Sequence, residues 1–236
     1  MSEPYRADNL LDRLGDAGTR QVHYDHEMRR ERAILDRRLA LTGGDVLSVG
    51  CGWHPGRHLF PRPAFRMTGV DLDAEMIDSL RASGELDDGA VGRAGRLPYE
   101  PASFDVVLYR LVLHHVVYQG PLAPVFAEAA RLLRPGGALV AVEPGLWHPV
   151  GAGLALANRA GLGPAVHGTP DDIPLSPRLL TREARAAGLE PELHAVTYGW
   201  RRLPASAQRA LHALDGAGSR PRLAPFGHTL MMIARG

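Results

Sequence analysis

Segments with strand-like and helix-like spacing of apolar residues alternate along this chain, and the alternation becomes regular from Val46 onward. Short apolar runs bounded by Gly and Pro are typical of strands, whereas apolar residues spaced three and four apart are typical of helices. Strands that alternate with helices predict a parallel, doubly wound α/β sheet. We expect strands near 46–50, 66–71, 89–93, 104–109, 138–143, 190–198 and 226–234, with helices near 56–61, 74–83 and 121–134.

Two regions depart from this alternation. Residues 21–42 predict a helix whose arginines face solvent, so that 1–42 forms a helical cap segment before a main domain at 43–236. Residues 144–176 are rich in Gly and Pro and contain a short apolar helix near 150–160, which predicts an insertion after the fifth strand. Such an insertion lies at the edge where open α/β sheets bind ligands. The expected buried side of the first helix is Met28, Ile34, Leu35, Leu39 and Leu41, and Thr181 is the expected N-cap of a later helix that ends at Gly188.

Composition excludes several classes of protein. The chain has 236 residues, of which 27 are basic and 26 acidic, so no overall field favours nucleic acid or an anionic membrane. All the basic residues are arginine, which removes lysine as a catalytic base. Cys51 is the single cysteine, so an internal disulfide is excluded. Without an apolar stretch that could span a bilayer, we expect a cytoplasmic protein.

The most informative segment runs from Val46 to Asp71. An apolar strand leads into Gly50, Cys51 and Gly52, where bare backbone N–H groups meet the edge of the sheet. Asp71 follows about twenty residues later, the spacing at which an acid at the end of the next strand binds a ribose diol. Together these features predict a ligand that contains a nucleoside.

The turn does not match a dinucleotide site. Trp53, His54 and Pro55 follow Gly52, and bulky residues there leave little room for a pyrophosphate. With the segments RLPYEPASFDVVLYRLVLHHV (96–116) and RLLRPGGALVAVEPG (131–145), the pattern resembles the class I S-adenosylmethionine-dependent methyltransferases of the small-molecule type. The resemblance covers roughly residues 40 to 145 and the C-terminal strand pair. It implies a Rossmann-like seven-stranded sheet whose last strand is antiparallel.

The resemblance also implies the positions that hold S-adenosylmethionine, whose product is S-adenosylhomocysteine. Asp71 is expected to bind the ribose hydroxyls and Leu72 to pack on the adenine. The remaining expected cofactor-binding residues are the glycine turn with Gly50, Cys51 and Gly52, the turn after the third strand with Arg93, Ala94 and Gly95, and Arg110 at the end of the fourth strand.

Three side chains are candidates for acceptor chemistry. Tyr109 ends the fourth strand, where this fold faces the sulfonium methyl, and the alternative is that it packs under the cap. His115 is the candidate general base, whereas His114 is expected to be structural. His148 could deprotonate an acceptor, or its turn could simply anchor the insertion. We expect no metal, because loop solvation and capping explain His167, Asp171 and Asp172.

We expect methyl transfer to O, N or C of a small metabolite, in secondary metabolism, by a monomer or homodimer. The family often has acids where this chain has Ser48 and Arg93, and its turn is enlarged at 53–55. A second hypothesis is therefore a methyltransferase-like lyase or cyclase that binds the nucleoside without transferring methyl. There, Arg93 and Arg96 would meet a phosphate or carboxylate. The third hypothesis is a non-catalytic subunit.

Overall fold

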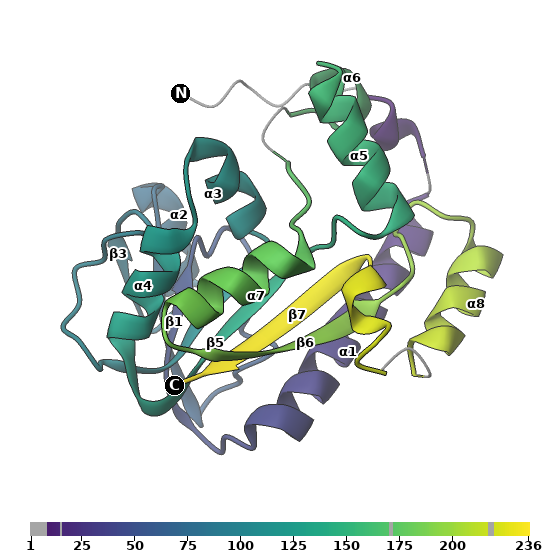
Figure 1. The fold of residues 1–236 in the computed structure, drawn as a ribbon. Coiled ribbons are helices and arrows are strands. Elements are labelled where there is room, and N and C mark those ends of the chain that lie inside the picture. Colours follow the sequence, from purple (N-terminus) through teal and green to yellow (C-terminus); the bar gives the residue numbers. More distant parts are fainter. Residues whose placement is uncertain (1–8, 15, 170–171, 217–219) are drawn as a thin grey trace.

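The computed structural model describes residues 9–14, 16–169, 172–216 and 220–236, which form one seven-stranded sheet flanked by helices (Figure 1). The strand order is β3-β2-β1-β4-β5-β7-β6, and only β7 runs against its neighbours. The strands are β1 (Gly44–Val49), β2 (Phe65–Asp71), β3 (Asp88–Val91), β4 (Phe104–Arg110), β5 (Leu133–Pro144), β6 (Glu190–Thr197) and β7 (Thr229–Arg235). The sheet confirms the predicted fold class, including the antiparallel last strand.

Helices cover both faces of the sheet. They are α1 (Ala17–Leu39), α2 (Ala74–Ala82), α3 (Leu113–Gln119), α4 (Ala123–Leu132), α5 (Pro149–Arg159), α6 (Gly163–His167), α7 (Pro177–Ala186) and α8 (Ala205–Asp215), with short 3₁₀ turns η1 (Leu11–Arg13) and η3 (Ala224–Phe226). Alternate residues of a strand point to opposite faces. Leu47 and Val107 accordingly pack on the side of α4 and α7, whereas Val46 and Val106 pack on the side of α1.

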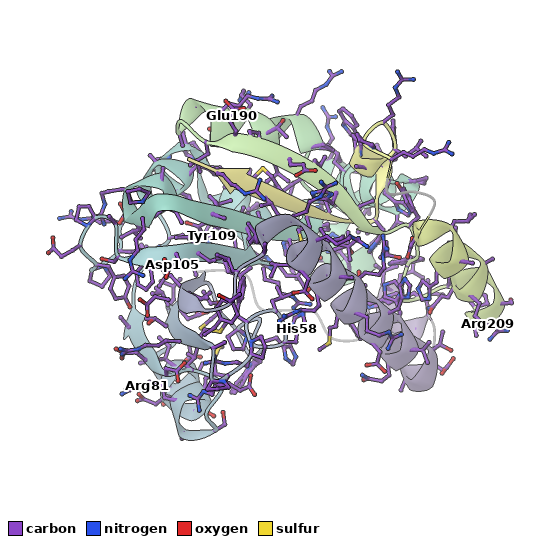
Figure 2. The ribbon with its side chains drawn as sticks, turned by 90° about the horizontal axis from the view of Figure 1, so that it is seen from below. His58, Arg81, Asp105, Tyr109, Glu190 and Arg209 are labelled. Atoms are coloured by element: carbon purple, nitrogen blue, oxygen red, sulfur yellow. The ribbon has the colours of Figure 1, made fainter. Side chains whose placement is uncertain are left out.

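The first helix lies across one face of the sheet, as Figure 2 shows from below. Its C-terminal half packs Ile34 and Leu35 against the apolar strands. Its N-terminal half buries the polar residues His23 and Glu27, whereas Met28 is 38% exposed. The prediction that Met28 is buried is therefore wrong, because this half of the helix faces histidine and carboxylate partners rather than apolar strands.

Other local predictions need correction. Residues 56–61 form turns rather than a helix. Ser176 is the N-cap of α7 and Pro177 occupies the first turn, so Thr181 lies inside that helix. The short helices α3 and α6 were not expected. Asp171 lies outside the described residues. No helix in the described part of the chain has both the length and the apolarity needed to cross a membrane.

The insertion forms α5 and α6 above the end of the sheet that holds β5, β7 and β6, well away from α2 and β3 (Figure 1). Its two helices contact each other, and α6 contacts η1. Near its two ends, Gly145 and Leu175 form a parallel bridge. This leaves the carboxyl ends of β1, β2 and β4 free to form a site of their own.

Candidate functional site

A glycine turn at the end of β1 forms the floor of the site. Gly50 and Gly52 have φ angles of 62° and 47°, a region that L side chains rarely adopt. The N–H groups of Gly50 and Cys51 both donate to the carbonyl of Val70, at 2.7 and 3.1 Å. The turn is therefore tied to β2, and its backbone is held at the edge of the sheet.

Substitution of the two glycines is expected to have different results. A Cβ on Gly50 would lie 2.2 Å from Cγ2 of Val112, whereas a Cβ on Gly52 would meet nothing within 4 Å. Left-handed backbone alone costs an alanine about 1 kcal/mol, and overpacking adds about 1–3 kcal/mol. In urea unfolding, Gly50→Ala should therefore lose roughly twice as much stability as Gly52→Ala. Equal losses would contradict this packing.

Asp71 at the end of β2 is held in place by backbone donors. One carboxylate oxygen accepts from the N–H of Gly52 at 3.0 Å, and the other accepts from Leu72 at 2.7 Å and from Asp73 at 3.3 Å. An ionised carboxylate has about four acceptor positions. The fixed, half-buried carboxylate of Asp71 therefore retains acceptor capacity for a ligand.

A cavity of about 640 Å³ opens beside these residues. This volume lies within the range of roughly 300–1,000 Å³ that is typical of small-molecule sites. Leu111 at its edge has a φ of 56°, a conformation that is uncommon outside glycine. The lining residues are Val49, Gly50, Gly52, Asp71, Leu72, Gly92 to Arg96, Leu111, Val112, His115, Val116, Gln119, Gly120, Pro121, Pro124 and Val125.

The wall formed by α3 depends on Glu143, a residue that sequence reasoning did not propose. Glu143 is fully buried at the end of β5 and accepts from the backbone N–H groups of Val112 and Leu113, at 3.0 and 2.7 Å. Its other oxygen lies 2.7 Å from Nδ1 of His114. The carboxylate thus satisfies the free N–H groups at the start of α3, as a capping residue does. His115 and Gln119 on this helix line the cavity as a result.

The structure brings most of the proposed cofactor-binding residues to one cavity. Leu72 is 58% exposed at its edge. Cys51 does not line the cavity, and burial, assisted by the charge of Asp71, raises the pKa of its thiol to about 12. A thiol with this pKa is not a nucleophile near neutral pH. The proposed residues that line the cavity are Gly50, Gly52, Asp71, Leu72, Arg93, Ala94, Gly95 and His115.

Two other candidates lie at the end of β4 but outside this cavity. Tyr109 is fully buried, and its hydroxyl donates to the carbonyl of Val125 at 3.3 Å. Burial raises the pKa of this hydroxyl. Arg110 donates two hydrogen bonds to the carboxylate of Glu31 on α1, at 2.9 and 3.1 Å. Burial lowers the pKa of Arg110, but the paired Glu31 carboxylate raises it by more than burial lowers it. The guanidinium therefore stays charged. The catalytic and cofactor roles of these two residues stay predictions.

His148 lies at the start of the insertion rather than at the cavity. Its Nδ1 accepts from the N–H of Val150 at 3.3 Å, which caps α5, and its Nε2 lies 3.2 Å from the carbonyl of Tyr198. Burial lowers the pKa of this imidazole. These contacts match the alternative in which the turn anchors the insertion, and no described residue of 144–176 lines the cavity. In the described part of the chain, no group of three or more His, Cys, Asp or Glu residues is placed to hold a metal.

Comparison with known proteins assigns this chain to a family. Residues 47–141 match the family model described as a methyltransferase domain. The chain is 33% identical over 171 residues to a probable S-adenosylmethionine-dependent methyltransferase of Mycolicibacterium smegmatis, which covers 72% of this chain and 58% of that protein. It is 33% identical over 203 residues to the 27-O-demethylrifamycin SV methyltransferase of Amycolatopsis mediterranei, covering 78% and 71%.

Solved structures show the same fold. An S-adenosylmethionine-dependent methyltransferase from Thermotoga maritima superposes with a TM-score of 0.64 at 16% identity, over 92% of this chain and 90% of that one. Identity this low shows the fold alone. The chain spans less than two thirds of the M. smegmatis relative, so activity and substrate do not transfer directly from that protein.

Proposed function

Since the chain belongs to the class I S-adenosylmethionine-dependent methyltransferases, we propose that it transfers a methyl group to O, N or C of a small metabolite in a biosynthetic pathway. The observation that carries the proposal is the fixed carboxylate of Asp71 beside the glycine turn in one cavity. The name of the A. mediterranei relative supports a small acceptor of this kind.

The residues present fit the family's cofactor. Open space lies over Gly52, so the amino-acid tail of S-adenosylmethionine can approach the backbone there. Asp71 has acceptor capacity left for a sugar hydroxyl, and Leu72 presents an exposed apolar side chain to a base. When bound, S-adenosylmethionine supplies an activated methyl group.

The protein's part in the reaction is positioning and exclusion of water. The walls formed by Val116, Pro124 and Val125 are apolar, which favours exclusion of water from the reacting groups. His115 carries the only imidazole among the described lining residues. We therefore assign it the role of general base, which accepts the proton of an acceptor hydroxyl or amine. An acceptor that carries no such proton needs no base.

Binding of S-adenosylhomocysteine tests the cofactor assignment. We expect calorimetric titration to show binding to the wild type and roughly tenfold or greater weakening in Asp71→Asn, because each hydrogen bond to a charged group contributes about 1.5–3 kcal/mol. Asp36→Asn is the matched control, since this exposed carboxylate on α1 pairs with Arg32 alone among the described residues. Absence of binding in the wild type would instead support a non-catalytic subunit.

Methyl transfer itself is tested by mass. Incubation with S-adenosylmethionine and a panel of small hydroxylated and amino acceptors should add the mass of one methyl group to a member of the panel. The alternative is a lyase or cyclase, which Arg93 favours. It predicts that S-adenosylmethionine binds and that a member of the panel is converted to a product that has gained no methyl group.

A further inference from the structure

One carboxylate of the insertion reaches the helix that forms a wall of the cavity. Oδ1 of Asp172, which follows α6, lies 3.8 Å from Nε2 of His114 on α3. Its other oxygen lies 4.0 Å from Nδ1 of His167 at the end of α6. Asn158 on α5 contacts both insertion residues, because its amide donates to the backbone carbonyl of Asp172 at 3.0 Å and its Oδ1 lies 2.6 Å from Nε2 of His167. The two helices of the insertion therefore hold this carboxylate against α3.

The imidazole of His114 has an acid at each of its two nitrogens. Nδ1 lies 2.7 Å from Oε2 of the fully buried Glu143, and Nε2 faces Asp172 at an ion-pair distance. A neutral imidazole that donates from Nδ1 would turn the lone pair of Nε2 towards a carboxylate, whereas an imidazolium has a proton on both nitrogens. Opposite charges within about 4–6 Å favour the charged form of a group. These contacts therefore favour His114 as a cation.

The candidate base lies directly beside this imidazole. The ring centroids of His114 and His115 are 4.0 Å apart, and His115 lines the cavity. A positive charge at this distance disfavours the protonated form of a second imidazole. A cationic His114 therefore favours a neutral His115, which is the form that can accept a proton.

Other charged groups close to Glu143 are engaged elsewhere. Arg110 at the end of β4 feels the charge of Glu143, but its guanidinium is bound to Glu31 at 2.9 and 3.1 Å. Among the described residues, Glu143 and Asp172 are the carboxylates that face the ring of His114. The charge of this ring thus depends on one acid from β5 and one from the insertion.

We propose that Asp172 is a positioning residue, which together with Glu143 holds His114 as an imidazolium and so keeps His115 neutral as the base. Asp172 acts through His114 and does not need to touch the acceptor. Because Asp172 belongs to the insertion, the protonation state of the base is tied to the contact of α5 and α6 with α3. This inference rests on the proposed function, because it concerns the base of the same reaction.

Titration of the imidazoles by nuclear magnetic resonance tests the proposal without a known acceptor. The variants His114→Gln and His115→Gln identify the two sets of signals. In the wild type we expect His114 to carry a proton on both nitrogens near pH 7 and His115 to be neutral. In Asp172→Asn, the titration midpoint of His114 should fall and that of His115 should rise, each by about one pH unit. Asp172→Glu keeps the charge and should bring both midpoints back towards those of the wild type.

The matched control is Asp36→Asn, which removes an exposed carboxylate on α1. Equal shifts in this control would overturn the proposal, because the effect would then be one of net charge. A neutral His114 in the wild type would also overturn it. So would an Asp172→Asn protein that melts at a lower temperature while both midpoints stay unchanged, since Asp172 would then be merely structural. Failure of the wild type to bind S-adenosylhomocysteine would instead refute the proposed function, and the titrations would be unaffected by that result.

Discussion

Glu143→Ala is expected to lower the free energy of unfolding by about 4 kcal/mol, since removal of one partner from a buried charged network costs about 3–5 kcal/mol. The substitution leaves the N–H groups of Val112 and Leu113 and the imidazole of His114 buried without their acceptor. For a chain of this size, the melting temperature should fall by about 10 °C. Thermal unfolding followed by circular dichroism measures the change.

Glu143→Gln keeps the shape and one acceptor oxygen, so its loss should be smaller than that of the alanine variant. Glu190→Ala is the control, because Glu190 lies exposed at the start of β6, where Figure 2 labels it. A surface change of this kind is expected to stay within about 0.5 kcal/mol. A Glu143→Ala protein as stable as the control would show that α3 does not need this cap.

Acidification below pH 6.5 should destabilise the protein through partly buried imidazoles. His228 is partly buried and faces Glu27 and His23 on α1, His148 at the start of α5, and Arg201. The pKa of His228 is lowered to about 3, mainly by burial. The carboxylate of Glu27 raises this pKa, whereas the neighbouring His148, His23 and Arg201 lower it. Burial also lowers the pKa of His212 to about 4, beside His26, His23 and Asp215.

The direction follows from where the proton binds. Between pH 6.5 and the folded pKa, the unfolded chain protonates its histidine while the folded protein does not, so stability falls as the pH falls. His228 alone then accounts for a loss of about 3 kcal/mol at pH 4. The pKa of Glu27 is lowered to about 2 despite burial, mainly by its bond to His23, so this carboxylate adds a loss only below about pH 4.5.

Urea unfolding between pH 8 and pH 4 measures this dependence. His228→Asn should be less stable than the wild type at pH 8 but should lose less on acidification. His54→Asn, which changes an exposed histidine, should keep the slope of the wild type. An unchanged slope in His228→Asn would place the acid sensitivity in other groups.

The sequence predicted the sheet well because each buried strand carries its own signal in consecutive residues. Val46 to Val49 and Val106 to Tyr109 are buried and largely apolar, and parallel strands buried on both faces have such runs whichever partner they pair with. Gly50, Gly52 and Asp71 were found for the same reason, since a turn and the acid that follows it are local patterns.

The rest of the site depends on contacts that no local pattern contains. Helix α3 was missed because its capping carboxylate comes from Glu143, about thirty residues later. The position of Arg110 was decided by Glu31, which is 79 residues away on α1. A buried polar face on α1 has the same origin, because its partners His212 and Asp215 lie near the other end of the chain.

These separations also bear on the order in which the chain can assemble during synthesis. In the second half of α1, Glu31 and Arg32 bind early segments, at His58 and at the carbonyl of Leu59, each 27 residues away. The first half depends on residues made much later, since His23 and His26 bind partners 189 residues further on, and Glu27 binds one that is 202 residues further on. Helix α1 is therefore fully secured only after these later segments have been made.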